Sequence, residues 1–136
     1  MMGQLETAEV SGELSSQDVA NTLWAFATMG TKPGDRMMGQ LERRTEAISG
    51  EFNSQDVANT LWAFATMRTK PGEWMMGQLE RRAEAISGEF NSQNVANTLW
   101  AFATMGTKPR RRMMGLERRT EAISGEFNSQ EVANTM

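Results

Sequence analysis

The chain has 136 residues, a formal net charge of -3 and no Cys or His. Without Cys there is neither a disulfide framework nor a thiolate metal site, and without His the commonest general base and metal ligand is missing. No stretch approaches the ~20 apolar residues that a membrane-spanning helix needs. The composition therefore predicts one domain that is not an enzyme, carries no cofactor or metal and does not enter a membrane.

The first ten residues, MMGQLETAEV, contain neither a basic n-region nor an apolar h-region. They also lack the Arg- and Ser-rich composition of a transit peptide. We therefore expect no targeting peptide within this chain.

A segment of 38 residues recurs along the sequence. Residues 37–74 return almost letter for letter as residues 75–112, whereas residues 1–36 are two residues short and residues 113–136 are truncated and lack one Gln. A fixed period of this length is typical of solenoids, in which each unit buries its apolar face against its neighbours. We predict an all-α, right-handed α-solenoid of tandem helix–turn–helix repeats, forming a single domain over residues 1–136. Because the chain ends inside a repeat, we expect it to be a fragment of a longer array.

In the second repeat, the first helix is predicted over residues 54–67. Asn53 is a good N-cap, and Asp56 at the third helical position resembles a capping box. At about 100° per residue, an apolar side and a polar ridge separate, with Trp62 on the border between them. The apolar side consists of Val57, Ala58, Leu61, Phe64 and Ala65, and the ridge consists of Gln55, Asp56, Asn59 and Thr66, with the small Ala63 among them.

The turn TKPG leads to a second helix, predicted over residues 72–87. Its apolar stripe consists of Met75, Met76, Leu79, Ala83 and Ile86. Glu80, Arg81 and Glu84 are expected to point outward. Together with Arg82 they suggest a solvated charged face rather than a phosphate clamp.

The stop signals of the first helix differ between repeats. Gly30 and Gly106 suit the left-handed residue that follows many helices, whereas Arg68 stands at that place in the second repeat. We expect this arginine to weaken the helix stop there.

These residues carry a family likeness. The sequence SQDVANTLWAFATMGTKP, the ANTLWA core at residues 58–63 and the turn PGEW at residues 71–74 resemble the octotricopeptide repeat, over essentially the whole chain. The resemblance implies an α-solenoid that binds single-stranded RNA sequence-selectively. It implies a role in organellar RNA processing, stability or translation, in a chloroplast or a mitochondrion. Two repeats depart from the turn pattern, with PGDR and PRRR in place of PGEW.

The resemblance also implies that the first helix of each repeat lines the inner wall, so that its polar ridge faces the RNA. Asn and Gln amides both donate and accept hydrogen bonds, which suits unpaired base edges. The candidate RNA-binding residues of the ridge are Gln17, Asp18, Asn21, Thr28, Gln55, Asp56, Asn59, Thr66, Gln93, Asn94, Asn97 and Thr104. A basic rim expected to follow the phosphate backbone consists of Lys32, Lys70, Lys108, Arg110, Arg111 and Arg112. The ridge position held by Asp18, Asp56, Asn94 and Glu131 varies between repeats, as a modular recognition code would require.

Several features fit a structural role as well. The Trp residues are expected to pack between repeats more often than to offer a stacking face. Asn59 fits a bracing role and a ligand contact equally well. Only residues 75–112 are net basic, whereas nucleic-acid-binding domains are usually basic throughout. The alternative function is therefore a protein-interaction scaffold, and uncapped ends could drive end-to-end self-association.

Overall fold

The computed structural model describes residues 14–106 and 114–123. Within these residues the chain is all-helical and contains no strand, which confirms the all-α part of the predicted fold class. The helices are α2 (Ser16–Met29), α3 (Asp35–Ile48), η2 (Ser49–Glu51), α4 (Ser54–Thr66), α5 (Glu73–Ala85), η3 (Ser87–Glu89), α6 (Ser92–Met105) and α7 (Met114–Ile123), where η denotes a 3-10 helix. None of these helices is both long and apolar enough to cross a membrane.

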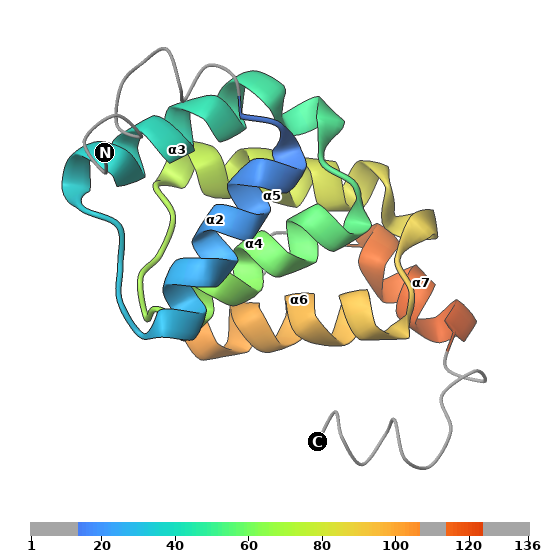
Figure 1. Cartoon of the computed structure of the whole chain (residues 1–136). Coiled ribbons are helices and arrows are strands. Elements are labelled where there is room, and N and C mark those ends of the chain that lie inside the picture. Colours follow the sequence, from blue (N-terminus) through green and yellow to red (C-terminus); the bar gives the residue numbers. More distant parts are fainter. Residues whose placement is uncertain (1–13, 107–113, 124–136) are drawn as a thin grey trace.

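The α-helices lie in two layers (Figure 1). In the first layer α2 packs against α4 and α4 against α6, and in the second layer α3 packs against α5 and α5 against α7. Consecutive helices alternate between the layers, and the short turns from α2 to α3 and from α4 to α5 join these helices as hairpins. The right-handed solenoid and the division into 38-residue units stay predictions.

Each helix of the first layer begins with a capping box. In α4 the Asp56 backbone N–H donates to Asn53 Oδ1 at 2.7 Å, and the Asn53 N–H donates to Asp56 Oδ2 at 3.2 Å. These reciprocal bonds satisfy two backbone donors that the first turn of a helix leaves open. The same arrangement joins Ser15 to Asp18 and Asn91 to Asn94. The predicted capping box is confirmed.

The three first-layer helices end in the same way. Gly30 and Gly106 adopt left-handed φ angles of 75° and 67°, and Arg68 adopts 56° at the equivalent position. The Arg68 N–H donates to the Ala65 carbonyl at 3.0 Å, which is a bond of the Schellman helix end. Arg68 therefore does not abolish the helix stop, although a residue with a Cβ is strained in this conformation.

The core lies between the two layers. The predicted apolar residues of α4 and α5 are buried in it: Val57, Ala58, Leu61, Phe64, Ala65, Met75, Met76, Leu79, Ala83 and Ile86. Phe52 and Phe90, which precede α4 and α6, are also fully buried. Two predictions were wrong. Ala63 was expected on the polar side of its helix but is 0% exposed, and Glu80 was expected to point outward but is 1% exposed. Both residues lie on middle helices, and packing from both sides leaves α4 and α5 little free surface.

A recurring arginine contact joins the layers. The Arg82 Nε–H in α5 donates to the carbonyl of Phe52 at 2.7 Å, directly before the N-cap of α4. Arg44 makes the same bond to Leu14 at 2.7 Å, and Arg119 bonds Phe90 at 2.6 Å. The expectation that Arg82 belongs to a solvated face was therefore wrong. Because Arg119 makes the same bond as Arg44 and Arg82, α7 has the register of α3 and α5 at this residue, although its repeat lacks one Gln.

Candidate nucleic-acid interface

One outward face of the first layer repeats the same four residue types. In α4, Gln55, Asn59, Trp62 and Thr66 fall within about 60° of one another around the helix axis. All four are exposed or half-buried. We call these residues and their counterparts the outer stripes: Gln17, Asn21, Trp24 and Thr28 on α2, Gln55, Asn59, Trp62 and Thr66 on α4, and Gln93, Asn97, Trp100 and Thr104 on α6. Because these helices lie side by side, the stripes form rows of amides and indoles across the layer, whereas the hydroxyl oxygen of Thr66 is buried.

Two of the predicted ridge residues do not belong to this face. Asp56 is 6% exposed and Asn94 is 8% exposed, and each is engaged in the capping box of its own helix. Asp56 Oδ2 also accepts a hydrogen bond from Ser16 Oγ of α2 at 3.0 Å. Asp18, at the same position of α2, is exposed, since no described helix covers that side of it. The accessible face therefore excludes Asp56 and includes Trp62, which lies on the other side of Gln55, Asn59 and Thr66 around the helix axis.

The indoles differ in their surroundings. The rings of Trp24 and Trp62 are stacked, with centroids 6.2 Å apart and planes inclined by 27°. Trp24 and Trp100 are 45% and 46% exposed, whereas Trp62 is half-buried between its neighbours. Within the described residues, Trp100 makes no such ring pair. Trp24 and Trp62 therefore pack between repeats as expected. The indoles of Trp24 and Trp100 nevertheless remain partly exposed to solvent.

A polar hollow of about 370 Å³ lies between the N-terminal halves of α4 and α6. It is lined by Asn53, Ser54, Gln55, Asn59, Glu89, Asn91, Gln93, Asn94 and Asn97. Four of these residues belong to the outer stripes of α4 and α6. The hollow presents amide donors and acceptors, the groups that can pair with the edge of an unstacked base.

A second hollow, of about 420 Å³, lies at the opposite ends of the same two helices. It is lined by Ala65, Arg68, Thr69, Lys70, Thr104 and Met105. Thr104 connects it to the outer stripe of α6. Sequence reasoning singled out Lys70 and Thr104 but missed Arg68, which had been considered only as a helix stop.

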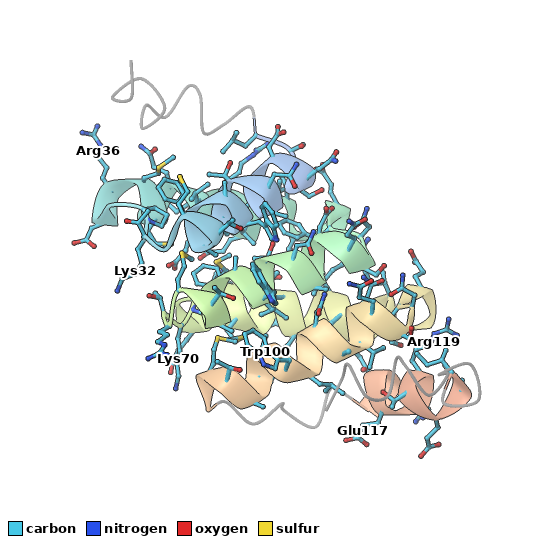
Figure 2. All side chains as sticks on the ribbon, turned by 60° about the horizontal axis from the view of Figure 1, so that its bottom comes forward. Lys32, Arg36, Lys70, Trp100, Glu117 and Arg119 are labelled. Atoms are coloured by element: carbon cyan, nitrogen blue, oxygen red, sulfur yellow. The ribbon has the colours of Figure 1, made fainter. Side chains whose placement is uncertain are left out.

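The basic rim is described only in part. Lys32 and Lys70 are exposed, and Figure 2 shows both at the side of the molecule where α2 and α4 end, with Trp100 farther along α6. The remaining predicted members, Lys108, Arg110, Arg111 and Arg112, lie outside the described residues. Among the described side chains no group of three or more carboxylates could hold a metal ion.

The arrangement offers amides for base edges, indoles for base faces and cations at one end, on helices held by capping boxes and arginine contacts. Comparison with known proteins gives no match among curated proteins. The chain does match one protein family over residues 4–136, which is almost its whole length. This chain belongs to the RNA-editing substrate-binding complex 6 protein family.

Proposed function

We propose that this chain binds single-stranded RNA along the outer stripes of α2, α4 and α6, as a non-enzymatic, modular part of an RNA-editing assembly. The aligned rows of Gln, Asn and Trp carry this proposal. Stacking on an aromatic side chain contributes roughly 1–3 kcal/mol per base, and amides can discriminate between base edges. Both groups stand on the same face of three adjacent helices.

The family match supports a role in RNA processing, since the family is named for a complex that binds RNA-editing substrates. It also favours an organellar location and gives no support to the chloroplast. The octotricopeptide-like repeat, its right-handed solenoid and its sequence-selective recognition remain part of the proposal. They rest on the repeat sequence and on the stacked hairpins.

The net charge of -3 lowers the RNA affinity that we expect, because phosphate contacts usually supply much of the affinity for nucleic acid. We therefore propose weak binding that depends strongly on stacking. A protein partner is the second candidate, and the exposed side of α6 favours it. Leu99 is 40% exposed there, whereas Leu61 at the same position of α4 is fully buried by its neighbours. The same surface would serve the proposed end-to-end self-association.

Short single-stranded RNAs of random sequence provide the test. The purified chain is mixed with this pool at two salt concentrations, with double-stranded DNA as the competitor, and the bound RNAs are sequenced. Enrichment of particular RNAs that DNA does not displace is the expected result. Folded, helical protein that retains no RNA at either salt concentration would refute the proposal and favour the protein partner.

A further inference from the structure

We propose that the hollow at the C-terminal ends of α4 and α6 is a phosphate-binding subsite for the backbone of single-stranded RNA, with Arg68 and Lys70 as its cationic residues. This inference rests on the proposed function and adds to it a defined site with a stated chemistry. Arg68 stands at the position that Gly30 and Gly106 hold in the neighbouring repeats.

The first argument is the chemistry of the lining. Arg68 and Lys70 both line a hollow of about 420 Å³, and two Thr residues line it with them. Within the described part of the chain, neither cation takes part in an ion pair with a carboxylate. A guanidinium offers a planar fork of donors that fits a phosphate in a bidentate manner, and an ammonium adds a mobile point charge. With respect to the described residues, the charges of this hollow are therefore available to an anion.

The second argument is the backbone of Arg68. Within the described residues it is the non-glycine residue with a positive φ, at 56°. Gly30 and Gly106 hold the same position in the neighbouring repeats and adopt this conformation without a Cβ penalty. An arginine there strains the backbone and makes no compensating ion pair in the described structure. Residues with a strained backbone cluster at active sites and ligand clamps.

The third argument is continuity with the RNA-binding face. Thr104 belongs both to this hollow and to the outer stripe of α6. The amide hollow begins near Gln93, which is eleven residues earlier on the same helix, or roughly 16 Å away along its axis. Trp100 lies between the two hollows on α6. An RNA strand whose bases lie on the indoles and amides can thus place a backbone phosphate beside Arg68.

Arg68→Gly separates a phosphate contact from a structural role. The glycine relieves the backbone strain, so the melting temperature should rise by about 3 °C. Loss of one charged contact should weaken RNA binding by about tenfold. The slope of log affinity against log salt should become shallower by about 0.7, the value for one phosphate on a single strand. The matched control is Arg81→Ala, which removes the same charge from an exposed site on α5 of the second layer.

Binding to the single-stranded RNA pool is measured over a salt series for the wild-type chain and both variants. Weaker binding with a shallower salt slope in Arg68→Gly, and wild-type behaviour in Arg81→Ala, is the expected outcome. A more stable Arg68→Gly chain with unchanged affinity or an unchanged slope would overturn the subsite while leaving the proposed function intact. Absence of binding by the wild-type chain would overturn both, and binding of an acidic peptide at this hollow instead would assign it to a protein partner.

Discussion

Three equivalent arginines of the second layer each donate a hydrogen bond to a backbone carbonyl just before the start of a first-layer helix. The bond from Arg82 Nε to the Phe52 carbonyl is 2.7 Å long and partly buried. In Arg82→Ala this carbonyl loses a charged donor, so we expect the free energy of unfolding to fall by about 2 kcal/mol. Arg81→Ala, one residue away and exposed, should change it by less than about 0.5 kcal/mol. Urea denaturation of both variants checks this, and equal effects would show that the contact contributes nothing specific.

At the left-handed helix ends, we expect two substitutions to change the stability of the chain in opposite directions. Gly106 has a φ of 67°, a conformation that a Cβ strains, so Gly106→Ala should destabilise the chain by about 1 kcal/mol. Arg68→Gly should stabilise it by a similar amount, about 1 kcal/mol. Gly88→Ala is the control, because Gly88 has no positive φ and an added Cβ there would meet nothing within 4 Å. Thermal unfolding would contradict the explanation if both alanine variants lost stability equally.

At the scale of helices, burial of a residue depends on which neighbours its helix has. Asp56 and Ala63 are buried on α4, yet Asp18 and Ala25 are exposed at the same positions of α2. Conversely, Ala65 is buried on α4, and Ala103 is exposed on α6. Since these pairs are identical residues in near-identical sequence, the difference comes from lateral packing alone. The face that stays free on all three helices is the one that carries the outer stripes.

Contact between α3 and the start of α5 makes stability depend on pH. Burial raises the pKa of Glu42 above 4.5, the Gly72 N–H lowers it and Glu46 raises it further, with a net upward shift. The folded chain therefore holds more protons than the unfolded chain just above pH 4.5, so stability falls as pH rises through this window.

Glu42→Gln should remove this contribution and flatten the fall in the free energy of unfolding across that window. Urea denaturation from pH 4.5 upward measures it, with exposed Glu51→Gln as the matched control. An unchanged slope in Glu42→Gln would show that this carboxyl does not titrate differently on folding.

For the molecule as a whole, the sequence predicted the helices, their capping boxes and most of the core. These features depend on local signals, such as Asn53 with Asp56 and the apolar spacing of α4, and local signals are present in each repeat. The arginine contacts were not predicted, although an Arg recurs in the sequence about 30 residues after the residue that precedes each first-layer helix.

The candidate site was predicted less well, because lateral packing is not encoded in one helix. A helical wheel places Asp56 and Trp62 on either side of the polar ridge. The contacts of α2 and α6 bury the aspartate and leave the indole row accessible. The hollow beside Arg68 likewise arises from two adjacent repeats, so neither repeat alone predicts it.

The central claim is that single-stranded RNA stacks on the outer stripes. The most direct measurement is the affinity of Trp100→Ala for the enriched RNA, beside Trp74→Ala, which removes a more exposed indole from α5, since Trp74 is 62% exposed and Trp100 is 46% exposed. Loss of one stacking contact should weaken binding by about tenfold or more in Trp100→Ala, whereas Trp74→Ala should bind like the wild type. Equal affinities for the two variants, with both folded, would contradict the account.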